Sequence, residues 1–228
     1  MTRFLAFGDS ITWGEDGRNS ASSLGSSGTV RPAVQFGTLD TYPGALQQRL
    51  MQLYTAQSPH VDNRGLPDEK VTDSTTFPRF LDLTSSGAYD AVLLMEGAND
   101  LGSHSNRDII AGLGRMIDDG KNRSMKVFLA TIPPEKAGIR GGAADLVAPF
   151  NAEVSNLATS KGVPLVDVYQ AFGGNLGLIG FDGLHPTADG YHLIADTFFA
   201  AIRQNLELPA ATSSNQSRVL RWFAPPRR

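Results

Sequence analysis

The first candidate for chemistry in this chain is the hydroxyl group of Ser10. It ends the tripeptide Gly8-Asp9-Ser10, which directly follows the short apolar run 4–7. If that run is a parallel strand, the serine lies at its carboxyl end, the edge of an open sheet where ligands bind. A serine hydroxyl becomes an effective nucleophile when a neighbouring base takes its proton. The chain must therefore be searched for a base, an acid that orients it, and donors for a developing negative charge.

A candidate base and its orienting acid lie together near the other end of the sequence. In Asp182-Gly183-Leu184-His185-Pro186 a carboxylate precedes a histidine by three residues, in a loop ahead of the last helical stretch. The carboxylate can accept a hydrogen bond from one ring nitrogen while the other ring nitrogen faces outward. Taken alone, such a pair is more often a structural hydrogen bond than a catalytic dyad.

Two further positions offer hydrogen-bond donors at strand ends. Asn99, in the segment 96–100, carries a side-chain amide that can donate to an oxyanion, and Gly65 ends the segment 62–65 after another strand. A glycine at a strand-to-loop turn lets the backbone approach a ligand closely. Each also has a structural interpretation, because Asn and Gly are common turn residues. We interpret Asp9 and Asp100 as residues that hold turns.

The elements that must bring these residues together are alternating strands and helices. Short runs rich in apolar residues alternate with longer stretches of helical periodicity, which is typical of βαβ units. We expect strands at 3–7, 60–64, 91–96, 126–132 and 163–168, and helices at 42–57, 75–83, through 109–117, at 146–160 and after Pro186. The runs 91–95 and 127–130 are apolar throughout, as strands covered on both faces are. The pattern predicts an α/β fold, a three-layer α/β/α sandwich around a flavodoxin-like five-stranded parallel sheet.

Helix boundaries and loops follow from local signals. Gly120 and Gly162 are expected to end the third and fourth helices, and Thr187 is expected to cap the start of the last one. Loops at 14–40, 133–143 and 173–180 all leave the carboxyl edge of the predicted sheet. The first of them, rich in Gly and Ser, is either a flexible linker without a role or a lid or wall of the substrate pocket.

Taken together, the four positions resemble the signature of the SGNH, or GDSL-type, serine hydrolase family of esterases and acylhydrolases. The signature residues of that family match Ser10, Gly65, Asn99 and His185, and the resemblance runs from the first strand to the last helix. Two neighbours depart from the family pattern. Ile11 follows the serine where leucine is usual, and Ala98 stands where threonine is common.

The resemblance implies a role for each matched residue. Ser10 would be the nucleophile, His185 the general base and then the general acid, and Asp182 the group that orients the imidazole. The backbone N–H groups of Ser10 and Gly65 and the side-chain amide of Asn99 would form the oxyanion hole. Preorganised donors of this kind stabilise the charge that develops on the former carbonyl oxygen.

The implied activity is that of a serine esterase acting on carboxylic esters of small to medium acyl groups through an acyl-enzyme on Ser10, with no metal or organic cofactor. Carbohydrate O-deacetylase, lysophospholipase and thioesterase activities of the same family stay open. A non-hydrolytic nucleotide- or flavin-binding domain is an alternative of another class, but the chain has no Gly-x-Gly-x-x-Gly run and no phosphate loop. A phosphohydrolase built on Asp9 would need further acidic residues for magnesium. An ordinary α/β-hydrolase is disfavoured because Ser10 lacks the Gly-x-Ser-x-Gly elbow.

Composition sets the remaining expectations. The chain has 228 residues, a net charge of -3 and no cysteine, which excludes disulfides and thiolate chemistry and gives no electrostatic reason to expect nucleic acid. No apolar run is long enough to span a membrane. We expect one hydrolase domain at 1–206 and a C-terminal tail at 207–228, docked through Trp222 and Phe223 if it is not mobile. The partner is expected to be a small-molecule ester, the oligomeric state is left open, and the location is taken as cytoplasmic by default, or secreted if a signal peptide was removed.

Overall fold

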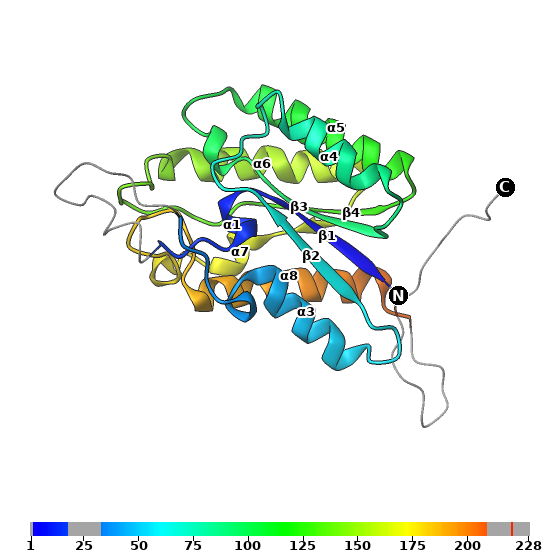
Figure 1. The fold of residues 1–228 in the computed structure, drawn as a ribbon. Helices are drawn as coiled ribbons and strands as arrows, with labels where there is room; N and C mark the ends of the chain where they lie inside the picture. The colour runs from blue at the N-terminus through cyan, green and yellow to red at the C-terminus, as the bar shows by residue number, and fades with distance from the viewer. Residues whose placement is uncertain (1, 18–32, 209–219, 221–228) are drawn as a thin grey trace.

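A parallel five-stranded sheet forms the centre of the molecule. The computed structural model describes residues 2–17, 33–208 and 220, and Figure 1 shows the fold. Within these residues the strands lie in the order β2-β1-β3-β4-β5, and all neighbouring pairs are parallel. The strands are β1 Arg3–Gly8, β2 His60–Gly65, β3 Ala91–Met95, β4 Lys126–Ala130 and β5 Leu165–Val166. This order is the flavodoxin-like one, so the predicted fold class is confirmed.

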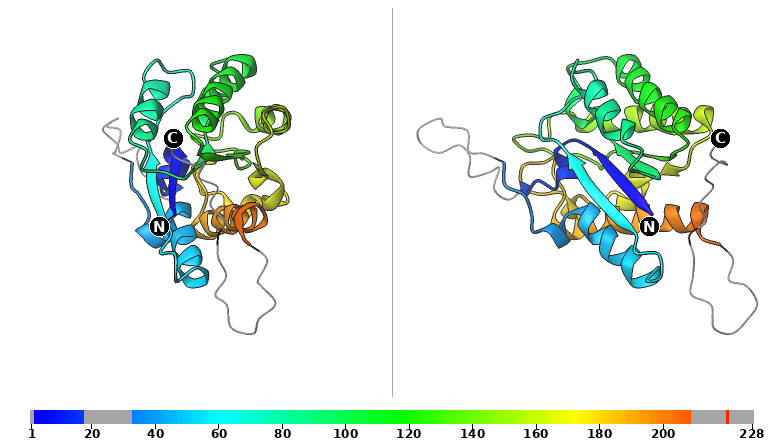
Figure 2. Two further views of the ribbon diagram at one scale, coloured as in Figure 1. Left: turned by 90° about the vertical axis from the view of Figure 1, so that its right-hand side faces the viewer. Right: turned by 45° about the vertical axis from the view of Figure 1, so that its right-hand side comes forward.

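Helices cover both faces of the sheet. The longer helices are α3 Tyr42–Leu53, α4 Thr76–Ser85, α5 Asn106–Asn122, α6 Ala144–Lys161 and α8 Ala188–Leu206. In Figures 1 and 2, α4, α5 and α6 lie on one side of the sheet, whereas α3 and α8 lie on the other. Short elements complete the fold: α1 Ser10–Trp13, α7 Val168–Phe172, and the 3-10 turns η1 Thr38–Asp40, η2 Ala98–Asp100 and η3 Leu176–Leu178.

Side-chain caps explain where several helices begin and end. The hydroxyl of Thr187 accepts a hydrogen bond from the N–H of Gly190 at 3.2 Å, which confirms it as the cap of α8. Gly162 ends α6 with a positive φ of 63°, as predicted. The prediction that Gly120 ends its helix was wrong, because α5 continues to Asn122. The short helix α1, which begins at Ser10, and the helix α7 were not predicted.

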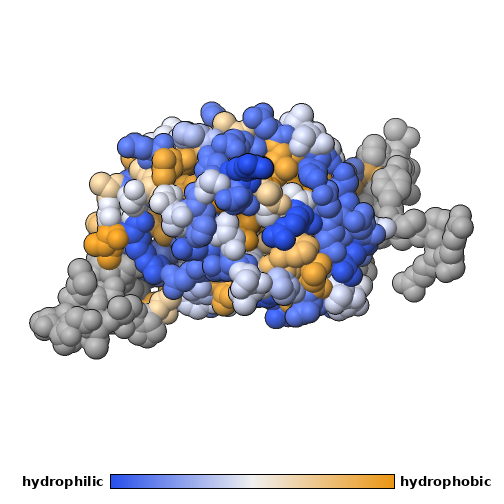
Figure 3. Space-filling model, turned by 90° about the horizontal axis from the view of Figure 1, so that it is seen from above, coloured by the Kyte–Doolittle hydropathy of each residue, from blue (hydrophilic) through white to orange (hydrophobic). Residues whose placement is uncertain are grey.

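The sheet is buried between its helical layers. The five residues of β3 are all buried, and so are Phe4, Leu5, Ala6 and Phe7 of β1. Figure 3 shows the face formed by the helices above the sheet as predominantly hydrophilic, with hydrophobic side chains in small separate groups. Burial on both faces explains why these strands are apolar throughout.

The segments that frame the site and the C-terminus are described only in part. Of the loop predicted at 14–40, residues 18–32 lie outside the described residues. At the other end α8 stops at Leu206, and Leu220 is buried, with its N–H and carbonyl both bonded to the side chain of Gln57. The predicted docking residues Trp222 and Phe223 also lie outside the described part. No helix among the described residues combines the length and the apolar character that crossing a membrane requires.

Candidate active site

The register of the sheet brings three strand ends side by side. Gly8 at the end of β1 pairs with Gly65 at the end of β2 and with Met95 at the end of β3. The residues that directly follow these ends therefore leave the sheet at the same edge. Ser10 and Asn99, which are far apart in the sequence, come together here because parallel strands present all their carboxyl ends on one side.

A tight strand-to-helix turn presents Ser10. Asp9 caps α1, and its Oδ1 accepts a hydrogen bond from the N–H of Ile11 at 2.8 Å. A Cβ on Gly8 would lie 2.1 Å from both the carbonyl oxygen of Met95 and the hydroxyl of Thr12, so only glycine fits beneath the turn. The turn-holding role predicted for Asp9 is thus the one its hydrogen bond shows.

Ser10, His185 and Asp182 form a continuous series of hydrogen-bonding groups. The Oγ of Ser10 lies 2.8 Å from Nε2 of His185, and Nδ1 of the same ring lies 2.5 Å from Oδ2 of Asp182. All three residues are almost completely buried. The sequence predicted this set, and the fold brings together residues separated by 175 positions.

The loop of Asp182 is fixed by backbone hydrogen bonds. Its Oδ1 accepts from the N–H groups of Leu184 and His185, both at 3.1 Å. Burial alone would raise the pKa of Asp182, but its hydrogen bonds and the charge of His185 outweigh burial and lower that pKa below the ordinary value. The N–H of Arg140 donates to the carbonyl of Asp182 at 2.8 Å, so the predicted 133–143 loop packs against this turn. An ionised Asp182 can hold the ring with its Nδ1–H toward the carboxylate.

The three predicted oxyanion donors are in different situations. Nδ2 of Asn99 donates to the carbonyl oxygen of Glu69 at 2.9 Å, which holds the side chain at the sheet edge and leaves one amide hydrogen. The N–H of Ser10, in the first turn of α1, has no intrahelical acceptor. The N–H of Gly65 instead donates to Oδ1 of Asn63 at 3.0 Å. Gly65 was predicted to donate its N–H to the oxyanion. In this structure that N–H is already bonded to Asn63, two residues earlier, in a local turn.

A cavity of about 410 Å³ opens beside Asn99. It is lined by Ala98, Asn99, Leu101, Gly102, Ser103, Glu135, Arg140, Gly142, Ala143 and Leu184. The cavity therefore borders both Asn99 and Leu184, the residue before His185. A second cavity of about 490 Å³ shares Glu135 with the first and is otherwise lined by Pro134, Ala144, Asp145, Tyr169, Gln170, Gly173, Gly174 and Leu176.

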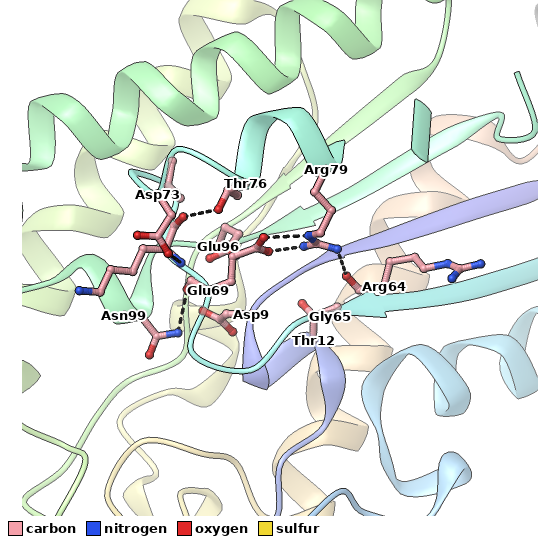
Figure 4. A network of polar contacts seen from close by, with 12 residues as sticks. Asp9, Thr12, Arg64, Gly65, Glu69, Asp73, Thr76, Arg79, Glu96 and Asn99 are labelled. Atoms are coloured by element: carbon pink, nitrogen blue, oxygen red, sulfur yellow. Dashed lines mark hydrogen bonds and ion pairs between the residues drawn. The ribbon is translucent and has the colours of Figure 1, made fainter. Parts of the chain in front are cut away.

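A buried group of acidic residues lies behind the turn of Ser10. Figure 4 shows Asp9, Glu69 and Glu96 gathered close to the first turn of α4, with the guanidinium of Arg79 paired to the carboxylate of Glu69. Oδ2 of Asp9 and Oε1 of Glu96 are buried without a hydrogen-bond partner among the described residues. Burial raises the pKa of Asp9 to about 7 and raises that of Glu96 well above its ordinary value.

Two charged residues near the site were missed from the sequence. Glu15, two residues after the end of α1, is buried, and its Oε1 accepts a hydrogen bond from Arg140 at 3.0 Å. The only local signal was a charged residue inside the Gly-rich 14–40 segment, where solvent exposure is the usual expectation. Arg140 is 125 positions away, so no sequence spacing could show the pair.

A parallel α/β/α sandwich with a serine, a histidine and an aspartate in series at its carboxyl edge defines the architecture of a serine hydrolase of flavodoxin-like fold. The model of the GDSL-like lipase/acylhydrolase family matches residues 6–193 of the sequence. The chain belongs to this family, and it is a hydrolase that acts on ester bonds. The family resemblance stated from Ser10, Gly65, Asn99 and His185 is thereby confirmed.

Solved structures share the fold at low sequence identity. Est24, a carbohydrate acetylesterase from Sinorhizobium meliloti, is 19% identical with a TM-score of 0.70, over 90% of this chain and 99% of its own. The inhibitor-bound aryl esterase of M. smegmatis is 22% identical with a TM-score of 0.70, covering 90% and 100% of the two chains. The lipase/acylhydrolase of Enterococcus faecalis is 23% identical, also with a TM-score of 0.70, covering 92% and 100%. No curated protein matches the sequence.

Proposed function

We propose that this protein is a serine esterase that hydrolyses carboxylic esters of small to medium acyl groups through an acyl-enzyme on Ser10. The observation that carries the proposal is the 2.8 Å separation between Oγ of Ser10 and Nε2 of His185, with Asp182 on the opposite side of the ring. In the first step Oγ attacks the ester carbonyl and its proton moves to Nε2. The bond to the alcohol then breaks as Nε2 returns that proton to the alcohol oxygen.

Water completes the reaction by the same route. It attacks the acyl carbonyl, gives its proton to Nε2, and releases the acid as the proton returns to Oγ. In each half of the reaction the carbonyl oxygen becomes negative. We propose that the remaining amide hydrogen of Asn99 and the N–H of Ser10 stabilise this oxyanion.

The size of the first cavity supports short and medium acyl groups. Its volume of about 410 Å³ lies at the small end of ordinary ligand sites, and apolar side chains such as Leu101, Ala143 and Leu184 share its lining with polar ones. Exposed apolar side chains also flank the site loops, because Ile139 precedes Arg140 and Phe181 precedes Asp182. These groups suit the apolar part of an ester.

Replacement of Ser10 by alanine is the direct test. We expect Ser10→Ala to lose hydrolysis of p-nitrophenyl acetate by at least about 10³-fold, because the nucleophile is absent while the fold is unchanged. The measurement is the steady-state rate together with the melting temperature. Activity retained by a folded Ser10→Ala protein would exclude the serine mechanism.

A series of p-nitrophenyl esters from acetyl to palmitoyl tests the proposed acyl size. We expect the highest kcat/KM at acetyl or butyryl, since the cavity beside Asn99 lies at the small end of ordinary ligand sites. A maximum at palmitoyl would instead favour a lysophospholipase or lipase.

Carbohydrate O-deacetylation is the second candidate. The observation that favours it is the second cavity, in which Tyr169, Gln170 and Asp145 offer aromatic and polar groups suited to sugar hydroxyls. The Sinorhizobium meliloti structure of the same fold is a carbohydrate acetylesterase, so an acetylated sugar is to be tested beside the p-nitrophenyl esters. A kcat/KM for an acetylated xyloside well above that for p-nitrophenyl acetate would favour this candidate.

A further inference from the structure

Glu15 brings a second carboxylate to His185, on the side away from Asp182. Oε2 of Glu15 lies 3.5 Å from Nε2, the same nitrogen that faces Ser10. The Glu15 side chain is buried, and this Oε2 atom has no hydrogen-bond partner among the described residues. One imidazole ring is therefore placed between two buried carboxylates.

The position of Glu15 is fixed from several elements. Gly14 ends α1 with a φ of 96°, and the N–H of Glu15 then donates to the carbonyl of Ser10 at 3.0 Å. The phenol of Tyr191 on α8 donates to the carbonyl of Glu15 at 2.8 Å. Arg140 holds the other carboxylate oxygen at 3.0 Å. The carboxylate thus cannot turn freely toward solvent.

A buried carboxylate oxygen without a donor is costly, and it favours any nearby group that can offer a proton or a positive charge. Neutral His185 with its proton on Nδ1 offers Glu15 no positive charge, and it has no N–H on the side that faces Glu15. Once the proton of Ser10 has moved to Nε2, the ring is positive and its new N–H lies beside Oε2. The attraction therefore becomes stronger in the state that the reaction must pass through.

We propose that Glu15 is a positioning residue whose carboxylate stabilises the protonated His185 formed when Ser10 transfers its proton to Nε2. The inference rests on the proposed function, because it needs His185 to act as the base. In this step the O–H bond of Ser10 breaks and the N–H bond of His185 forms, while Oγ bonds to the ester carbonyl carbon and the carbonyl oxygen takes the negative charge. Glu15 takes no proton and touches no substrate atom.

Arg140 moderates the effect of Glu15. Its guanidinium contacts Oε1 of Glu15 at 3.0 Å and, on its other side, the exposed carboxylate of Asp68 at 3.2 Å. The positive charge of Arg140 offsets part of the field that Glu15 exerts on His185. Glu15 and Asp68 therefore form a matched pair for a test. Both carboxylates contact Arg140, but of the two only Glu15 also contacts His185.

Other acidic groups also act on His185 and must be separated from Glu15. Asp182 faces Nδ1 from the same loop, while Asp9 at the start of α1 and Glu135 in the loop after β4 act through their charges. Burial raises the pKa of Asp9 to about 7, so Asp9 titrates in the range where a histidine base does. A direct measurement on the His185 ring is therefore needed beside the rate.

The test is the isosteric variant Glu15→Gln, which removes the charge and keeps an oxygen for Arg140. We expect the acid limb of the kcat/KM profile, and the NMR titration of the His185 ring protons, to move to lower pH by about one unit, because an opposite charge within 4–6 Å favours the charged form. Asp68→Asn is the control and is expected to leave both midpoints in place. Arg140→Gln should move the His185 titration the opposite way, because Glu15 then acts without its counter-ion.

Each outcome supports or overturns the proposed role of Glu15. A His185 titration unchanged in Glu15→Gln overturns the proposal, and equal shifts in Glu15→Gln and Asp68→Asn overturn it as well, since they would show a general effect of Arg140. If Glu15→Gln does not fold, the double variant Glu15→Gln/Arg140→Gln is compared with Arg140→Gln alone. A His185 titration at lower pH in the double variant supports the proposal, and equal midpoints overturn it. Wild-type protein without ester hydrolysis would end the proposed function, yet the NMR titration would still show whether Glu15 acts on His185.

Discussion

At the scale of single residues, the groups of the site differ in whether their hydrogen-bonding atoms are already occupied. Ser10, His185 and Asp182, the proposed triad, are held by short contacts to one another. The proposed oxyanion donors can act only where another acceptor does not already take their hydrogens. Asn99 gives one amide hydrogen to the carbonyl of Glu69 and keeps the other, while the N–H of Gly65 is taken by Asn63. A donor already in place needs no rearrangement when charge develops, so Asn99 is expected to contribute more to the rate than Gly65.

Replacement of Asn99 by alanine tests that expectation. We expect Asn99→Ala to lower kcat for p-nitrophenyl acetate by roughly 10²–10³-fold with a smaller change in KM, because the lost donor acts mainly on the transition state. Ser103→Ala, which alters the same cavity without removing an amide, serves as the control and should stay within a few-fold of wild type. A kcat within threefold of wild type in a folded Asn99→Ala protein would show that the oxyanion is held elsewhere.

At the scale of elements, helix α5 shows how packing overrides a local signal. Glycine is a common residue at helix ends, but α5 continues through Gly120 to Asn122. A Cβ at this position would lie 2.7 Å from Cγ2 of Val127, which is buried in β4. The glycine is needed for the close approach of helix and strand, and sequence periodicity cannot show such an approach. Gly114, in the same helix, has only ordinary contacts at 3.6 Å and beyond.

The two glycines predict opposite effects of the same substitution. We expect Gly120→Ala to lower the free energy of unfolding by about 1–3 kcal/mol, since the stiff Val127 side chain must move. Gly114→Ala should raise it by roughly 0.5–1 kcal/mol through helix propensity. Urea unfolding followed by circular dichroism measures both. Similar values for the two variants would show that close packing at Gly120 does not limit stability.

At the scale of the whole molecule, the buried acidic group links stability to pH. Asp9 and Glu96 are buried, each has an oxygen without a partner among the described residues, and the pKa of each is raised by burial. An acid whose pKa is higher in the folded protein keeps its proton there after the unfolded chain has lost it. Its contribution therefore weakens as the pH rises from the unfolded pKa toward the folded pKa.

Asp9→Asn separates this effect from the other titrating groups. Between about pH 4 and pH 7 we expect the stability of wild type relative to Asp9→Asn to fall by up to about 1.4 kcal/mol for each pH unit, because asparagine does not ionise and its oxygen can still cap α1. Urea unfolding at several pH values gives both curves. Parallel curves would show that Asp9 does not hold its proton in the folded state.

The features of the fold that could be predicted from the sequence are those set by neighbouring residues in the chain. Alternating apolar runs predicted the five-stranded parallel sheet, and Thr187 and Gly162 marked helix ends, because strand burial and capping act over a few neighbouring residues. The strand at 163–168 was drawn too long, since β5 covers only Leu165–Val166 before Asp167 caps α7. The strand ends there because Oδ1 of Asp167 accepts a hydrogen bond from the N–H of Gln170 at 3.1 Å, which starts α7.

The sequence by itself determined the chemistry that this protein carries: a serine after the first strand, an Asp182–His185 pair before the last helix, and an amide at Asn99 after the third strand. Only the tertiary structure decided how those groups are used. It brought Ser10 within 2.8 Å of His185, gave the N–H of Gly65 to Asn63, and placed Glu15 against the ring. The physical reason is that residue type fixes which protons a group can give or take, whereas burial and distance, which the fold sets, determine whether it does so.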